Sequence, residues 1–261
     1  MTDEYNPKYP LQTLSKALEI LNYIKDYPSS DGITLNTLSK NLEISKSSAH
    51  RILDTLLSYG FVEKSGSTIT KYRLSWAAYK VGIAVPKYHT LNSSNYASLL
   101  ETLSKDVHRT VTLSIPHEYS TITMYKFNSE SDMMSHAYLG NHNPLYATAS
   151  GKLFMLDFTQ EEIRNYFKGT EIKKYTSNTI LNFIDFLDEL NKVKVSGYSI
   201  DNCEYEENIM CVAMPIKDYT KRTVAAISIT DDAVNMTKGE IASILPKLKE
   251  VCDKISKYMG Y

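Results

Sequence analysis

The sequence predicts an α+β protein of two domains, because two patterns of apolar residues follow one another along its 261 residues. In roughly the first 60 residues, apolar side chains recur every three or four positions, which is helix periodicity. A hairpin signal at Ser65, Gly66 and Ser67 follows these helices. From residue 107 onward, segments in which apolar and polar residues alternate are mixed with helical segments, which indicates helices over a mainly antiparallel sheet. Three short helices followed by a hairpin is the order of a winged helix-turn-helix.

The helix boundaries of the first domain follow from local signals. The first helix should span residues 11–26 and end in the Pro- and Gly-containing stretch "DYPSSDG". Thr34 should cap a short second helix, and Ser45 should cap a third. Gly60 should end the third helix, as glycine often does at this position. Its predicted inward face comprises Ala49, Ile52, Leu53, Leu56 and Leu57.

The rest of the chain alternates helices and strands. Helices are expected at residues 75–85, 87–105, 159–168 and 178–195, with a further helix entered from "ATASGKLFML". Strands are expected at residues 107–115, 120–127, 197–201, 211–216 and 223–230. Thr237 and Glu240 form a capping-box pattern before the last helix, which Pro246 should kink or interrupt.

Composition excludes several protein classes. The three cysteines Cys203, Cys211 and Cys252 form no C-x-x-C pair, so neither a zinc ribbon nor a disulfide framework is expected. The N-terminus does not resemble a signal peptide, and no apolar run approaches the roughly 20 residues of a membrane span. We therefore expect a cytoplasmic protein without a membrane partner. The net charge is only −1, but residues 45–73 hold five basic and two acidic side chains.

The third helix is the candidate DNA reader. In a helix-turn-helix, the N-terminal residues of this helix enter the major groove, and small, polar or basic side chains suit that position. Arg51 is the best candidate for a bidentate contact to guanine, and the wing cations suit phosphates. The predicted DNA-binding residues are Ser45, Lys46, Ser47, Ser48, His50, Arg51, Lys64, Lys71 and Arg73. The alternative is a solvated helix face with a serine cap, and only the order of all five elements favours DNA.

Several stretches resemble the IclR family of bacterial and archaeal transcription regulators. In the first domain these are "TLSKALEILNYI", "GITLNTLSKNLEISKSSAHRILDTLLSYGFVEK" and "YRLSWAAYKVG". In the second they are "GNHNPLYATASGK", "GYSIDNCEYEENIMCVAMPIKD" and "VAAISIT", and the resemblance covers about residues 11–258. It implies a winged helix-turn-helix at residues 1–74, a linker helix at 75–86 and a GAF-like effector-binding and oligomerisation domain at 87–261.

The resemblance also implies a function. The expected protein is not an enzyme and has no cofactor, no metal and no catalytic residue. It binds a pseudo-palindromic double-stranded operator as a homo-oligomer, either a dimer or a dimer of dimers, and a small organic-acid effector changes its affinity. The effector-binding positions carried over are Ala149, Ser150, Gly151, Asp201, Cys211, Ser228 and Thr230.

Elementary chemistry supports part of this site. Ala149, Ser150 and Gly151 stand at the entry to a helix expected to start near Gly151, where free amides favour an anion. Ser228 and Thr230 are two apart on one strand and so share a face. An ionised Asp201 would repel a carboxylate, so it should accept from a hydroxyl or another donor; a small hydroxy-, oxo- or phenolic acid is the expected ligand.

The alternatives for single residues are ordinary ones. Cys211 could be a small buried apolar residue, Ser228 and Thr230 could face solvent, and Asp201 could cap a turn. Lys152 could add charge to the pocket or extend outward.

Two positions depart from the family pattern, since Met210 stands where many members have Arg and Arg109 where members often have Glu. Two other functions also stay open. Cys211 with a histidine could form a nucleophile pair, or His108, His117, His136 and His142 could gather a metal in a metal- or redox-responsive regulator, although their spacing supports neither.

Overall fold

The computed structural model describes residues 8–66, 68–82, 94–128 and 139–261, and the chain divides into two compact units, Thr2–Asn92 and Ser93–Tyr261. The division lies beyond the predicted linker at 75–86, within the helix expected at 87–105. Residues 83–86 of that linker, the start of the helix expected at 87–105, and His136 lie outside the described residues. Of the helices in the described ranges, none has both the length and the apolar character needed to cross a bilayer.

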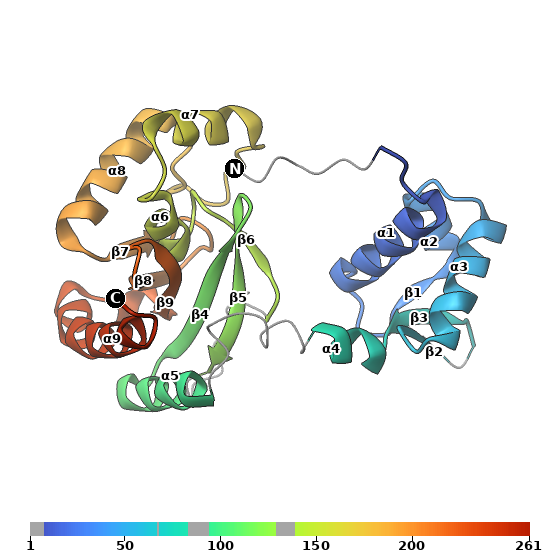
Figure 1. Cartoon of the computed structure of the whole chain (residues 1–261), viewed down its shortest axis with the longest axis horizontal. Helices are drawn as coiled ribbons and strands as arrows, with labels where there is room; N and C mark the ends of the chain where they lie inside the picture. The colour runs from blue at the N-terminus through green and yellow to red at the C-terminus, as the bar shows by residue number, and fades with distance from the viewer. Residues whose placement is uncertain (1–7, 67, 83–93, 129–138) are drawn as a thin grey trace. The chain divides into compact units, whose positions relative to one another are not determined.

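The first unit contains four helices and a three-stranded sheet among its described residues (Figure 1). Its elements are α1 (Gln12–Asp26), β1 (Ile33–Thr34), α2 (Leu35–Asn41), α3 (Lys46–Ser58), β2 (Val62–Ser65), β3 (Lys71–Leu74) and α4 (Trp76–Gly82). The sheet has the order β1-β3-β2, and β2 and β3 form the predicted hairpin. The sequence did not predict β1, in which Ile33 pairs with Tyr72 of β3.

Side-chain caps explain where the helices of this unit begin. The Thr34 hydroxyl accepts a hydrogen bond from the amide of Thr37, and the Ser45 hydroxyl accepts one from the amide of Ser48. Gly60 follows α3 with φ +70°, a left-handed conformation that glycine adopts without a steric penalty. The three predicted caps and helix ends are therefore confirmed.

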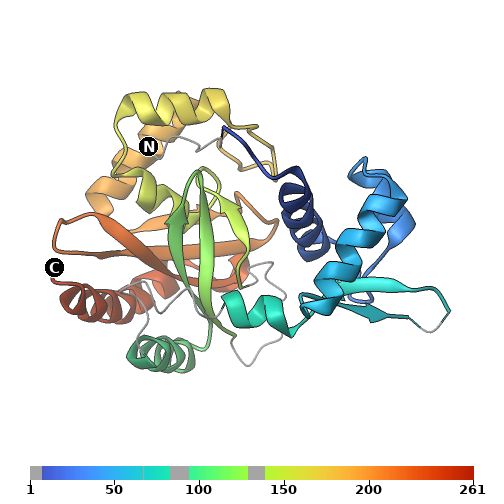
Figure 2. The ribbon, with the colours of Figure 1, turned by 45° about the vertical axis from the view of Figure 1, so that its right-hand side comes forward.

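The second unit is a six-stranded antiparallel sheet with helices on both faces (Figure 2). Its strands are β4 (Thr110–His117), β5 (Ser120–Phe127), β6 (His142–Pro144), β7 (Ser199–Asn202), β8 (Ile209–Lys217) and β9 (Thr223–Asp232), in the order β6-β5-β4-β9-β8-β7. Its helices are α5 (Ser94–Val107), α6 (Ala149–Met155), α7 (Gln160–Gly169), α8 (Phe183–Ser196), the 3-10 turn η2 (Ala233–Asn235) and α9 (Lys238–Tyr258). The α+β class and the antiparallel sheet are confirmed.

The two faces of this sheet differ in chemistry because side chains alternate along each strand. Figure 2 shows α5 and α9 on one side of the sheet and α6, α7 and α8 on the other. Alternate positions of β4 and β9 carry the fully buried apolar residues Leu113, Ile227 and Ile229. The positions between them carry hydroxyl groups such as Thr112 and Ser228, which pair at 2.6 Å.

Several boundaries differ from those expected. The helix α8 begins at Phe183 rather than near 178, because the preceding residues form a turn in which the Thr179 hydroxyl accepts from the Thr176 amide at 2.9 Å. The helix α9 continues through Pro246 without interruption. A short strand, β6, occupies part of the stretch expected to be only a loop.

The capping box before α9 forms only in part among the described residues. The Thr237 hydroxyl accepts from the Glu240 amide at 3.3 Å, as predicted. The Glu240 carboxylate binds the Arg109 guanidinium at 2.9 Å instead of returning to its own helix end. Arg109, which precedes β4 and is distant in sequence, therefore takes the place of the local backbone amide as the partner of Glu240.

Candidate functional site

The α3 helix presents its polar N-terminal half to solvent, as predicted. All six candidate residues on this helix and its cap are exposed, whereas Ala49, Ile52 and Leu53 are buried in the core of the unit. The six exposed residues are Ser45, Lys46, Ser47, Ser48, His50 and Arg51. The helix therefore combines an apolar face that holds it in the unit with a free polar face.

The predicted DNA-binding cations fall into two groups. His50 contacts Asp54 at 3.0 Å, Lys71 contacts Asp31 at 3.4 Å, and Arg73 contacts Glu63 at 2.6 Å. Lys46, Arg51 and Lys64 form no ion pair within the described part of the chain. A phosphate or base could bind these three without displacing a carboxylate of the protein.

A cavity of about 560 Å³, its open mouth included, lies beside the polar face of the second sheet. Its lining comprises Thr112, Ser114, Thr121, Thr123, Asn143, Thr148, Ala149, Ser150, Asp201, Tyr205, Glu206, Ile209, Cys211, Ser228 and Thr230. Six of the seven predicted effector-binding residues are among them. The Cys211 thiol and the Thr230 hydroxyl lie 3.2 Å apart in this wall.

The seventh residue, Gly151, does not line the cavity. A Cβ at this position would collide with the backbone of Leu145, so the glycine lets α6 lie directly against that segment. The helix begins at Ala149, two residues earlier than expected, and the Thr148 hydroxyl accepts from the Gly151 amide at 3.2 Å. Gly151 thus positions Ala149 and Ser150, which line the pocket.

Sequence reasoning missed the hydroxyl groups from β4 and β5. Thr112, Ser114, Thr121 and Thr123 line the cavity together with Ser228 and Thr230. The alternation of hydroxyl and apolar residues in "TVTLSI" was the available signal, but strand pairing is needed to show that it faces the same space as β9. In the structure, Thr112 is directly opposite Ser228.

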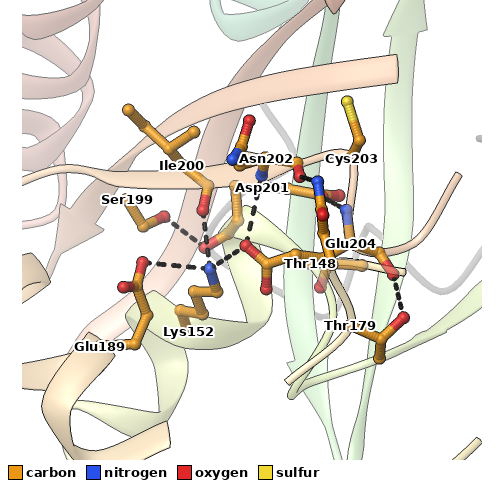
Figure 3. A network of polar contacts seen from close by, with 12 residues as sticks. Thr148, Lys152, Thr179, Glu189, Ser199, Ile200, Asp201, Asn202, Cys203 and Glu204 are labelled. Atoms are coloured by element: carbon orange, nitrogen blue, oxygen red, sulfur yellow. Dashed lines mark hydrogen bonds and ion pairs between the residues drawn. The ribbon is translucent and has the colours of Figure 1, made fainter. Parts of the chain in front are cut away.

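Lys152 is not a pocket residue, nor does it extend to solvent (Figure 3). Its side chain is 0% exposed, and its Nζ contacts the Glu204 carboxylate at 2.6 Å and the Glu189 carboxylate at 3.2 Å. It also donates to the Ile200 carbonyl at 2.7 Å. The outward alternative for this lysine was wrong, because the side chain is buried and links α6 to α8 and to the turn after β7.

Asp201 lines the pocket and caps a turn at the same time. Its Oδ1 accepts from the amide of Glu204 at 2.7 Å, and the residue is 4% exposed. Burial raises the pKa of Asp201 to about 7, the nearby Glu204 carboxylate adds to the rise, and the Glu204 amide and Lys152 ammonium oppose it. With a pKa near neutral pH, Asp201 can also be protonated, and its carboxyl group can then donate a hydrogen bond as well as accept one.

Comparison with known families decides the identity of the chain. Residues 13–66 match the family described as IclR helix-turn-helix domain, and residues 89–257 match bacterial transcriptional regulator IclR C-terminal. The chain belongs to the IclR family. It is a DNA-binding transcription regulator, and the prediction that it is not an enzyme is confirmed because its relatives are regulators.

Relatives and solved structures agree with this assignment. The chain is 27% identical over 250 residues to the HTH-type transcriptional regulator KdgR of Escherichia coli, covering 95% of this chain and 94% of KdgR. The crystal structure of the Thermotoga maritima IclR superposes with a TM-score of 0.77 at 30% identity, covering 97% of this chain and 100% of the other. An IclR homologue from Microbacterium hydrocarbonoxydans, complexed with 4-hydroxybenzoate, has the same fold, with a TM-score of 0.80 at 16% identity and 95% and 99% coverage.

The two departures from the family pattern lie outside the pocket lining of this IclR-family chain. Met210 pairs with Asn202 and Asp231 in the sheet but does not line the cavity. The Arg109 guanidinium, 13% exposed, contacts Asp231 at 3.0 Å and Glu240 at 2.9 Å. Arg109 therefore connects the ends of β9 and α9 rather than contacting a ligand in the pocket.

The pocket thiol of this IclR-family chain is not an activated nucleophile. Burial raises the pKa of Cys211, and the Asp201 charge adds to the rise. Burial also raises the pKa of Cys203 and Cys252. Among the described residues, no three histidine, cysteine or acidic side chains come together as a metal site.

Iodoacetamide should therefore label Cys211 slowly in the folded protein at pH 7.5. A pKa raised by one unit reduces the thiolate fraction about tenfold, so labelling should be at least about tenfold slower than in the urea-unfolded chain. Peptide mass spectrometry over a time course measures this, with buried Cys252 as the internal control. Rapid labelling of Cys211 alone in the folded protein would favour the nucleophile alternative.

Proposed function

We propose that this regulator binds a small hydroxylated organic acid in the pocket of its second domain, and that binding changes its affinity for a pseudo-palindromic operator. The observation that carries the proposal is the lining of the pocket. Eight lining residues carry Ser or Thr hydroxyl groups: Thr112, Ser114, Thr121, Thr123, Thr148, Ser150, Ser228 and Thr230. Each can donate and accept, which suits a ligand with several oxygen atoms.

Two further features favour an acid. The first amides of a helix have no partner within that helix, and Ala149 and Ser150 occupy these positions of α6 at the pocket wall. The homologue from Microbacterium hydrocarbonoxydans binds 4-hydroxybenzoate, which carries both a carboxylate and a hydroxyl group. This agrees with a hydroxy- or phenolic acid as the ligand class. We also propose that the second domain is a GAF-like effector-binding domain.

The DNA-binding half of the proposal rests on α3. Arg51 reads a base in the major groove, and Lys46 lies in the same exposed helix start. Lys64, Lys71 and Arg73 contact phosphates, the last two after releasing their carboxylate partners. Two such modules in a homodimer, or in a dimer of dimers, read two half-sites in the cytoplasm.

The α4 helix is the proposed route of communication. The Ala77 amide donates to the Gly60 carbonyl at 3.1 Å, and the Ser75 amide donates to the Phe61 carbonyl at 2.9 Å. The start of α4 is thus fixed to the residues that directly follow α3. A movement of the linker that begins with α4 would reach α3 through these two hydrogen bonds.

A thermal-shift screen tests the ligand class. We expect gluconate, pyruvate or 4-hydroxybenzoate to raise the midpoint temperature of thermal unfolding, since a ligand at 100 times its Kd adds about 2.7 kcal/mol of stability. Ser228→Ala should weaken binding about 2- to 10-fold by removing one hydrogen bond. Ser243→Ala, an exposed serine on α9, is the matched control. Stabilisation only by cations or purely apolar compounds would contradict the proposal.

A further inference from the structure

Among the described residues, the pocket lining has acidic groups but no basic side chain. Asp201 and Glu206 both line it, whereas no Lys, Arg or His of residues 8–66, 68–82, 94–128 and 139–261 does. With both carboxyl groups ionised, an organic anion would enter a site that already holds two negative charges. Such a site repels the anion unless a carboxyl group becomes neutral or a cation enters with the ligand.

The nearest buried cation cannot provide that charge. The Lys152 ammonium already contacts Glu189 and Glu204 and donates to the Ile200 carbonyl, and it is fully buried (Figure 3). Its charge is therefore balanced by the two carboxylates. Lys126 on β5 is another cation of this region; it interacts with Glu206, and it does not line the pocket.

The other titratable groups around Asp201 do not supply positive charge either. The Glu204 carboxylate, on the turn that Asp201 caps, adds to the negative potential. Burial raises the pKa of the Cys203 and Cys211 thiols and of the Tyr205 phenol, so all three stay neutral at physiological pH. Because Asp201 is buried in the pocket wall, it is the group that we expect to gain a proton.

We propose that the pocket binds an organic anion together with one proton, and that the protonated carboxyl of Asp201 donates a hydrogen bond to the ligand carboxylate. This rests on the proposed function, because it requires that the ligand is an acid. The proton comes from solvent and stays on Asp201, and no covalent bond changes. Asp201 Oδ1 continues to accept from the Glu204 amide, so the second oxygen is the donor.

The proposal fixes the sign of the pH dependence. Burial already raises the pKa of Asp201 to about 7, and a bound carboxylate raises it further. Below that pH the carboxyl group is already protonated, so affinity should be constant and no proton should be taken up. Above it, affinity should fall by up to about tenfold per pH unit, with uptake of about one proton.

Calorimetry of the full chain tests this. Gluconate, pyruvate and 4-hydroxybenzoate are each titrated at pH 5.5, 7.0 and 8.5, in two buffers of different ionisation enthalpy at each pH. The difference in measured heat between buffers gives the number of protons taken up. Asp201→Asn preserves the oxygen that accepts from Glu204 and replaces the proton donor by an amide donor, so it should bind with a constant affinity at all three pH values. Glu206→Gln, the matched removal of the other pocket charge, should keep the pH dependence.

Each outcome decides the proposal. A Kd that weakens above pH 7 with proton uptake in the native chain, and a flat profile in Asp201→Asn, support it. Tight binding at all pH values without proton uptake overturns it while the proposed function stands, and weaker binding by Asp201→Asn would then assign Asp201 as an ionised acceptor. A profile flattened by Glu206→Gln instead places the proton on Glu206 and also overturns it. No binding of any of the three acids at any pH overturns the proposed function itself, and the inference with it.

Discussion

Replacing Lys152 with methionine should lower the free energy of unfolding of the second domain by about 3–5 kcal/mol, because it leaves the buried Glu204 carboxylate without its cation. The Glu204 side chain is 6% exposed, and its Oε1 contacts the Lys152 ammonium at 2.6 Å. Methionine fills a similar volume, so the loss of charge rather than of packing decides the result. The double variant Lys152→Met/Glu204→Gln should recover part of this loss, because the buried charge of Glu204 is then removed.

The second domain can be followed separately from the first. The only tryptophan, Trp76, lies in the unit Thr2–Asn92, so its fluorescence reports the first unit, while far-UV circular dichroism reports both. Urea titration should show an earlier dichroism transition and an unchanged Trp76 transition. Lys192→Met is the matched control: Lys192 contacts the same Glu189 at 3.1 Å but is 75% exposed, so it should change stability by at most about 1 kcal/mol. Equal effects of the two variants would contradict the assigned role of Lys152.

The loss of unfolding free energy caused by Lys152→Met should depend on pH, and the direction of this dependence can be derived. Burial raises the pKa of Glu204 even with Lys152 present, and removing the ammonium raises it further. A carboxyl whose pKa is higher in the folded than in the unfolded state loses stability as pH rises above its unfolded value. The free energy of unfolding of the variant should therefore be closer to that of the native chain at pH 5 than at pH 8.

Replacing Arg51 with alanine should weaken operator binding by about 1–3 kcal/mol, or roughly 5- to 150-fold, and relax specificity at one base pair. Arg51 is exposed on α3 and has no ion-pair partner within the described residues, so its guanidinium is free to bind a base edge. The operator is first selected from a pool of random duplexes, and affinity is then measured by fluorescence anisotropy on the selected site and on single-base variants.

Lys64→Ala is the informative comparison for Arg51→Ala. Lys64 lies on the wing strand β2, also exposed, and is predicted to contact phosphate. Its loss should weaken all duplexes about equally and lower the salt slope by about 1. If Arg51→Ala leaves operator affinity unchanged, or weakens every sequence equally, Arg51 is not the base-reading residue.

The sequence was sufficient to predict structural features that depend on a single short segment of the chain. The caps at Thr34 and Ser45, the end of α3 near Gly60 and the face shared by Ser228 and Thr230 all follow from residues close together in the chain. These features depend on backbone geometry within one helix or one strand. The exposure of the polar half of α3 could be predicted for the same reason.

Features that depend on partners distant in sequence could not be predicted in this way. Thr112 joins the pocket only because β4 pairs with β9, where its partner Ser228 lies 116 residues further along the chain. Lys152 is buried only because Glu189 and Glu204 converge on it from two other segments. The raised pKa of Asp201 likewise follows from burial, which its sequence neighbours do not reveal.

The central proposal is that an acid in the pocket changes operator affinity. It is tested most directly by measuring the binding of operator and of acid on one sample. Anisotropy of a labelled operator is recorded with and without an acid that calorimetry shows to saturate the pocket. Linkage predicts that the operator Kd changes about 5- to 150-fold, and that operator changes the acid's Kd by the same factor. Ser228→Ala should shift the acid concentration at the midpoint, and Ser243→Ala should not. An operator Kd that is the same with the pocket empty and saturated would contradict the account.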